Sequence, residues 1–146
     1  MIPDFIDVGA PWHVLPPGVH DATLEQVEDR FAKSNHRKTL FSGFKSGVMA
    51  LSKAGCRTIL LDGSFVTSKP IPGDFDACWD PIGVDPKKLD PCLLDFSNQR
   101  RAQKQKFGGE FFPGTFLADG NRFFADFFQI DKHTGNPKGI VRIRLP

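Results

Sequence analysis

The chain has 146 residues, of which 40% are hydrophobic and 25% are charged. This length favours one domain with a single core, and the balanced composition excludes a disordered or fibrous protein. A net charge of +2 is too small to indicate general binding to nucleic acid or to membranes. The charge is unevenly spread, because residues 99–146 hold nine Lys and Arg against four acids.

The cysteines and the hydropathy pattern bear on the cellular compartment. Cys56, Cys78 and Cys92 form no CxxC pair, which argues against a disulfide framework and against a thiolate zinc site. The N-terminal segment has no basic region followed by a long apolar run, and no stretch of about 18 consecutive apolar residues occurs. We therefore expect a cytoplasmic protein that does not bind membranes.

The first part of the chain is rich in helix-breaking residues. Residues 1–20 contain four prolines and two glycines, a composition that disfavours helices and central strands. We therefore expect residues 1–22 to form an extended arm, packed on a single domain that covers residues 23–146.

Two helices are predicted after this arm. The first covers about residues 23–33, because Thr23 and Gln26 have the spacing of a capping box and apolar residues follow at helical intervals. The second covers about residues 37–53, where the apolar residues lie on one helical face and Gly55 is placed to end the helix.

Short β-prone runs bounded by glycine or proline turns dominate the rest of the chain. Four of them are predicted strands, namely Cys56–Leu61, Phe75–Trp79, Glu110–Phe112 and Ile140–Arg144. A long helix is predicted from Asp90-Pro91 to Phe107, before Gly108-Gly109. Residues 123–128 fit a helix or a strand equally well. Strands that alternate with helices indicate an α/β (α+β) protein with a sheet covered by helices.

The most informative segment joins the first two predicted strands. Leu60-Leu61 is followed by Asp62-Gly63-Ser64 and, after nine intervening residues, by Asp74-Phe75-Asp76. Alternate side chains of a strand share a face, so Asp74 and Asp76 should project together. Paired carboxylates are ligands that Mg²⁺ prefers, and a glycine turn lets backbone N–H groups and a hydroxyl approach a phosphate.

This pattern resembles the signature of the DNA polymerase β-like nucleotidyltransferase superfamily, and in particular its small, minimal members. Gly63 and Ser64 match the phosphate-binding turn of that superfamily, and Asp74 and Asp76 match its metal-binding pair. The resemblance implies a small mixed sheet flanked by helices. The chain is also similar to a small family of bacterial and phage-associated proteins of this fold, through the segments LPPGVHDATLE, DGSFVTSKPIPGDFDACWD, KFGGEFFP and PKGIVRI.

The resemblance implies a third carboxylate on a later strand. The order strand, helix, strand favours Glu110, which begins the run Glu110–Phe112. Asp95 is the runner-up and would take the role if the segment around it were a strand instead of a helix. Asp126 is a more distant third candidate.

Two departures from the superfamily pattern concern the phosphate-binding turn. Asp62 stands where a hydrophobic residue is usual, and the loop after Ser64 lacks the arginine common in minimal members. Lys69 is a substitute cation for the triphosphate, and Ser68 beside it is a further candidate for binding the nucleotide.

The resemblance implies a metal-dependent nucleotidyltransferase. Such an enzyme would use Mg²⁺ or Mn²⁺ to transfer a nucleoside monophosphate from an NTP to a hydroxyl on protein, RNA or a small molecule, with pyrophosphate leaving. The context implied is a toxin–antitoxin or phage-defence system with a cognate protein partner. The alternative is a catalytically inactive binding module on the same fold, such as an antitoxin or a regulatory subunit, because a fold does not determine a function.

Overall fold

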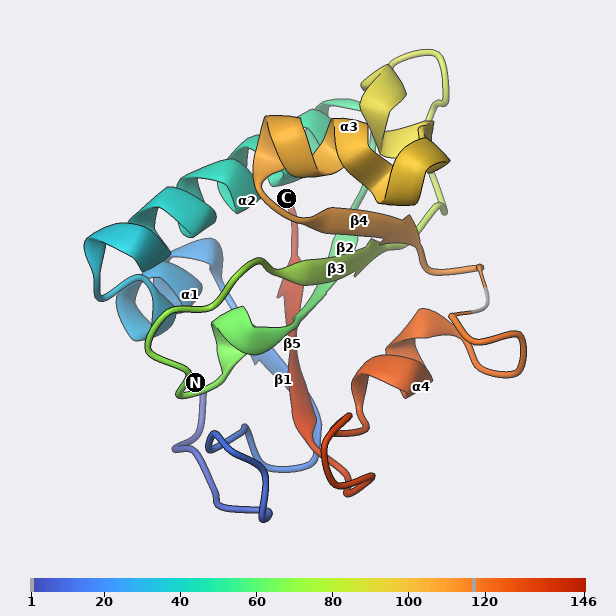
Figure 1. Ribbon diagram of the computed structural model, residues 1–146. Helices are drawn as coiled ribbons and strands as arrows, with labels where there is room; N and C mark the ends of the chain where they lie inside the picture. Colours follow the sequence, from blue (N-terminus) through green and yellow to red (C-terminus); the bar gives the residue numbers. More distant parts are fainter. Residues whose placement is uncertain (1, 117) are drawn as a thin grey trace.

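A five-stranded mixed sheet forms the centre of the computed structural model, which describes residues 2–116 and 118–146 (Figure 1). Its strands are β1 (Gly18–Ala22), β2 (Thr58–Asp62), β3 (Asp76–Trp79), β4 (Glu110–Pro113) and β5 (Gly139–Arg144). They lie in the order β1-β5-β2-β3-β4. β2 is antiparallel to both of its neighbours, whereas β1 is parallel to β5 and β3 is parallel to β4. The predicted α/β fold with a mixed sheet is confirmed.

Helices cover both faces of the sheet, but unequally (Figure 1). They are α1 (Leu24–Phe31), α2 (Asn35–Lys53), α3 (Ser97–Phe107) and α4 (Phe124–Phe128), with the 3₁₀ turns η1 (Ser64–Val66) and η2 (Pro91–Leu94). The larger hydrophobic cluster joins α1, α2 and α3 to one face of the sheet, and a smaller cluster joins α4 to the other face. Since neighbouring residues of a strand point to opposite faces, Leu61 belongs to the first cluster and Leu60 packs against the second.

The helices expected after the arm are present. Thr23 caps α1 through a complete capping box with Gln26, as its sequence predicts. Ser34 caps α2, so this helix starts two residues before the expected boundary at 37. Residues 124–128 are helical, which decides the open alternative for the segment 123–128.

Part of the N-terminal segment joins the sheet. The parallel pairing of β1 with β5 makes β1 an edge strand, a position that suits a segment preceded by prolines. The N-terminal segment that lies outside the sheet therefore ends before Gly18, whereas the sequence predicted an extended arm up to residue 22.

The prediction of one long helix from Asp90 to Phe107 is wrong. Asp90 caps only the short turn η2, and Asp95 then accepts hydrogen bonds from both the N–H and the hydroxyl of Ser97. This local bonding competes with helix formation. The three residues that follow have positive φ angles of 50°, 58° and 62°, at Asn98, Gln99 and Arg100. The regular part of α3 begins only after them.

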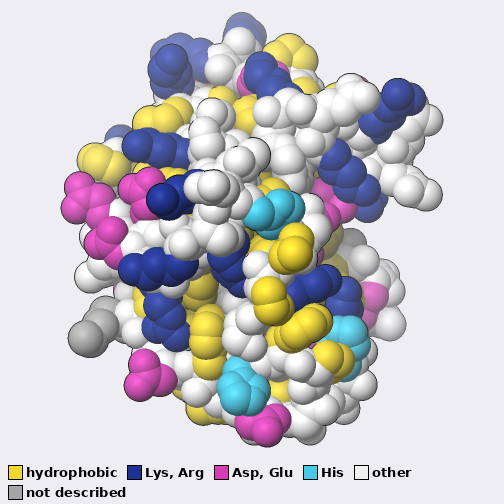
Figure 2. All heavy atoms as spheres, turned by 60° about the vertical axis from the view of Figure 1, so that its left-hand side comes forward, with side chains coloured by type: hydrophobic (Ala, Val, Ile, Leu, Met, Phe, Trp, Pro, Cys, Tyr) yellow, Lys and Arg dark blue, Asp and Glu magenta, His cyan; other side chains and the backbone are white. Residues whose placement is uncertain are grey.

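The surface charge is mixed. Figure 2 shows Lys and Arg side chains spread over one face between hydrophobic, acidic and histidine side chains. Within the described residues, no helix has the length and apolar character needed to cross a membrane.

Candidate functional site

The glycine turn after β2 lies directly against the start of β3. Gly63 has a φ of 91°, a conformation that L side chains rarely adopt. A Cβ atom at this position would also lie 2.9 Å from the backbone nitrogen of Asp76. Both the conformation and the close approach therefore require glycine, and they place Ser64, the first residue of η1, beside the acidic strand.

Three carboxylates form a row across neighbouring strands. Asp62 of β2 is paired in register with Asp76 of β3, and Asp76 is paired with Glu110 of β4. Residues paired in this way project from the same face of the sheet, which here is the face covered by α4. Asp74 lies two residues before Asp76 along the chain. Carboxylate oxygens of Asp74, Asp76 and Glu110 all lie within 4.8 Å of one another.

The structure thus brings together the predicted acidic pair and the preferred third carboxylate. Asp95 is held in the turn before α3 by Ser97, and Asp126 is exposed on α4. Neither belongs to the described cluster around Asp74.

The two outer carboxylates of the row have cationic partners. Asp62 forms a buried ion pair with Lys138. The two oxygens of Glu110 lie 2.6 Å from Nε of Arg100 and 3.3 Å from Nζ of Lys104.

The other two carboxylates, Asp74 and Asp76, form a central pair that has no such partners among the described residues. Across residues 2–116 and 118–146, no ion pair includes Asp74 or Asp76. The negative charge of the cluster is therefore least compensated at this pair.

This arrangement changes the protonation of the acids. Burial raises the pKa of Asp76 to about 7, and the negative charges of Asp74, Asp62 and Glu110 add to the effect. The pKa of Asp74 is also raised, by burial and then by the charge of Glu110. Burial raises the pKa of Asp62 too, although Lys138 opposes this shift.

The acidic pair has the chemistry of a hard cation site. The donors are carboxylate oxygens from nearby residues, and a bound cation would oppose the two causes that raise both pKa values, which are burial and then the repulsion between the acids. Mg²⁺ and Mn²⁺ prefer such oxygen ligands. Asp74, Asp76 and Glu110 therefore fit a divalent cation.

A cleft of about 480 Å³ opens over this pair. Gly63, Ser64, Asp74 and Asp76 line it from the β2–β3 side. Basic side chains line it as well, and they come from three separate parts of the chain: Lys69, Arg122, Lys132 and Lys138. The cleft therefore combines carboxylates that could hold a cation with positive groups that favour an anionic ligand.

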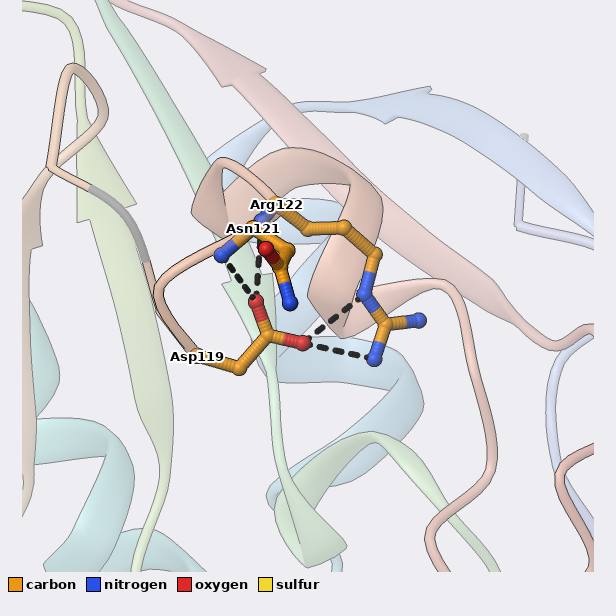
Figure 3. Close-up of polar contacts among 3 residues, drawn as sticks. All are labelled: Asp119, Asn121 and Arg122. Atoms are coloured by element: carbon orange, nitrogen blue, oxygen red, sulfur yellow. Dashed lines mark hydrogen bonds and ion pairs between the residues drawn. The ribbon is translucent and has the colours of Figure 1, made fainter.

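Arg122 is oriented at the cleft by a neighbouring acid (Figure 3). One carboxylate oxygen of Asp119 accepts the backbone N–H groups of Asn121 and Arg122. The other accepts Nε and Nη2 of the Arg122 guanidinium, at 2.9 and 2.7 Å. The arginine is thus held in a local turn just before α4.

The two candidate residues after η1 have different surroundings. Lys69 lines the cleft. Ser68 is not among the lining residues: its hydroxyl accepts the backbone N–H of His13 at 2.8 Å, and its own N–H donates to the carbonyl of His13 at 2.9 Å. Ser68 thus ties the N-terminal arm to the loop after η1.

Buried Arg37 of α2 fixes the same loop. Its guanidinium donates to four backbone carbonyls at 2.5–3.1 Å, those of Phe31, Phe65, Thr67 and Lys69. Three of these carbonyls belong to the segment from η1 to Lys69, so one side chain sets the path of the chain behind Ser64.

Lys132 and Lys138 could not be identified as site residues from the sequence. The one available signal was Asp62, an acid at the end of an apolar strand, because a buried carboxylate needs a cationic partner. Its partner, Lys138, is 76 positions away in the chain.

Replacing Arg37 by Met should destabilise the fold strongly. The substitution leaves buried carbonyls without donors, so we expect the free energy of unfolding in urea to fall by about 3 kcal/mol. Arg101→Met, at an exposed position, is the control and should change it by less than about 0.5 kcal/mol. Equal effects of the two variants would contradict the role given to Arg37.

The raised pKa of Asp76 predicts an unusual pH dependence of stability. Its pKa rises from 3.8 to about 7 on folding, so the folded state binds this proton more tightly than the unfolded state. Without metal, the contribution of Asp76 to stability is therefore complete below about pH 4 and is lost as the pH rises through 7. Asp76→Asn should remove this loss and raise the free energy of unfolding at pH 8 by about 1–3 kcal/mol.

The same group should couple metal binding to pH. Since Mn²⁺ competes with the proton on Asp76, its affinity should rise roughly tenfold per unit between about pH 5 and pH 7. Calorimetric titration measures this slope, and Asp126→Asn, at an exposed acid, serves as the control. A flat pH profile, or equal Mn²⁺ binding by Asp76→Asn, would argue against the metal site.

Comparisons with known proteins identify a family. No curated protein and no solved structure matches the chain. Residues 8–144 match the family of unknown function DUF6932, and this match covers most of the chain. The chain therefore belongs to the family of unknown function DUF6932.

Proposed function

We propose that this protein is a metal-dependent nucleotidyltransferase that transfers a nucleoside monophosphate from an NTP to a hydroxyl acceptor. The observation that carries the proposal is the meeting of Asp74, Asp76 and Glu110 beside the Gly63-Ser64 turn, at a cleft with basic side chains. The acceptor would be a protein, an RNA or a small molecule, and the setting a toxin–antitoxin or phage-defence system with a protein partner.

The order of the elements also supports this proposal. A strand leads into the glycine turn, the next strand carries the acidic pair, and a helix then leads to the strand that begins with the third carboxylate. This is the order implied by the resemblance to the nucleotidyltransferase superfamily.

Each group in the cleft has a role in such a transfer. Asp74 and Asp76 would hold Mg²⁺ or Mn²⁺, with Glu110 completing the set, and the bound cation would neutralise phosphate charge and orient the oxygens. Ser64 would hold the triphosphate through its hydroxyl and backbone N–H, while Lys69 and Lys132 would attract its negative charge.

The bonds and protons of the proposed step balance. The acceptor oxygen forms a bond to the α-phosphorus as the bond from that phosphorus to the bridging oxygen breaks, and pyrophosphate leaves with the bonding electrons. The hydroxyl proton passes to a carboxylate of the cluster. Phosphoryl transfer depends mainly on positioning and charge stabilisation, so it requires no nucleophilic Ser, Cys or His of the protein.

One observation favours the second candidate, a binding module without catalytic activity. Both oxygens of Glu110 already face cations, Arg100 and Lys104, which compete with a metal for this carboxylate. In that case the cleft would hold a nucleotide or a segment of a partner protein without transferring a group.

A labelling experiment separates the two candidates. The protein is incubated with Mg²⁺ and each α-labelled NTP, alone and with cell extract as a source of acceptors. We expect label on an acceptor, and a loss of at least about 100-fold in Asp74→Asn plus Asp76→Asn, because the charge that stabilises the transition state is no longer held. Asp126→Asn should keep full activity.

A different result of this labelling experiment would support the binding module. If the wild-type protein transfers no label, and its binding of NTP changes neither with metal nor with the double substitution, then the binding module is the correct reading.

A further inference from the structure

The N-terminal arm is tied to two segments of the chain that contribute residues to the cleft. On one side, His13 and Ser68 exchange the two hydrogen bonds already described. On the other side, the side-chain amide of Asn136, in the segment before β5, donates to the carbonyl of Val8 at 3.0 Å. The arm is thus fixed at both ends of residues 8–13, beside the loop that precedes β5 (Figure 1).

Trp12, within this fixed segment, lines the cleft. It is only partly buried, and among the residues that the structure describes neither hydrophobic cluster includes it. By contrast, Leu15, three residues later, is fully buried in the larger cluster. Other residues therefore anchor the arm, and packing into the core does not explain why the indole ring of Trp12 lies at the cleft.

The ring face of Trp12 is turned toward a second residue of the cleft. Nζ of Lys69 lies 6.0 Å from the centroid of the indole ring, at the outer limit of a cation–π contact. Lysine is a long flexible side chain, so its ammonium group can move aside and leave the ring accessible to a ligand.

The lining of the cleft is chemically mixed. It includes apolar residues, among them Val14 and Ile130, as well as the acids and cations named above. The cleft volume of about 480 Å³ is within the range of sites for small molecules, about 300–1,000 Å³.

We propose that Trp12 is the platform on which the base of a nucleotide stacks, with the triphosphate directed to Ser64 and the acidic pair. This inference rests on the proposed function, because that function supplies the nucleotide. A base has a flat π face that suits a partly exposed indole, and stacking on an aromatic side chain accepts every base. The arm thus contributes a specificity residue for nucleotides over other phosphate compounds.

Fluorescence gives a direct test, since the chain has two tryptophans. Trp79 is buried, and its Nε1 has no hydrogen-bond partner within the described structure, so Trp79→Phe removes a donor that is unpaired there. In this variant Trp12 is the only source of tryptophan emission. We expect ATP with Mg²⁺ to quench this emission, and tripolyphosphate with Mg²⁺ to bind without quenching it.

Affinities measured by calorimetry complete the test. Trp12→Leu should weaken the binding of ATP with Mg²⁺ by about 5- to 100-fold and leave the affinity for tripolyphosphate unchanged. Phe123→Leu, at an exposed aromatic residue that is not among the cleft-lining residues, should change neither affinity.

The possible failures are distinguishable. If Trp12→Leu weakens both ligands by the same factor, or if ATP does not quench the emission of Trp12, the stacking platform is wrong and the triphosphate site of the proposed function stands. If the wild-type protein binds neither ligand with Mg²⁺, both proposals are wrong.

Discussion

The crowding of carboxylates at one end of the sheet is the constraint on which the site depends. The register of β2, β3 and β4 places Asp62, Asp76 and Glu110 side by side, and Asp74 adds a fourth acid. Buried negative charges are costly unless cations or hydrogen bonds compensate them. Lys138 compensates the charge of Asp62, and Arg100 with Lys104 compensates that of Glu110. The charges of the central pair can be compensated only by a bound proton or by a ligand.

These compensating cations also tie distant elements to the site. Lys138 precedes β5, so its ion pair with Asp62 links the segment after α4 to the end of β2. Arg100 reaches Glu110 from a backbone with a φ of 62°, a conformation that costs a non-glycine residue on the order of 1 kcal/mol or more. The short contact with a buried carboxylate, at 2.6 Å, offsets part of this strain, so the break before α3 and the acidic row stabilise each other.

Patterns of neighbouring residues predicted most of the helices and strands. They did not predict the contacts between residues that are far apart in the chain. Thr23 and the β-prone runs predict their elements because capping and alternation are properties of neighbouring residues. The order strand, helix, strand implied by the resemblance favoured Glu110 over Asp95, and Glu110 belongs to the described acidic cluster. The prediction of a helix from Asp90 was wrong because Asp95 accepts hydrogen bonds from Ser97, and this local turn interrupts the helix. No local pattern could pair Asp62 with Lys138 or bring Trp12 to the cleft, since both depend on how the sheet and the arm fold together.

The uncompensated central pair bears on the choice between an enzyme and an inert module. A carboxylate whose pKa rises to about 7 on folding destabilises the metal-free protein at neutral pH. A cation held by Asp74 and Asp76 would offset this cost, because its attraction to the two carboxylates would oppose the effects of both their burial and their mutual repulsion. This cost supports the proposed cation-binding function over a module that binds no cation, and the basic groups around the cleft support the proposal of a ligand that carries phosphate.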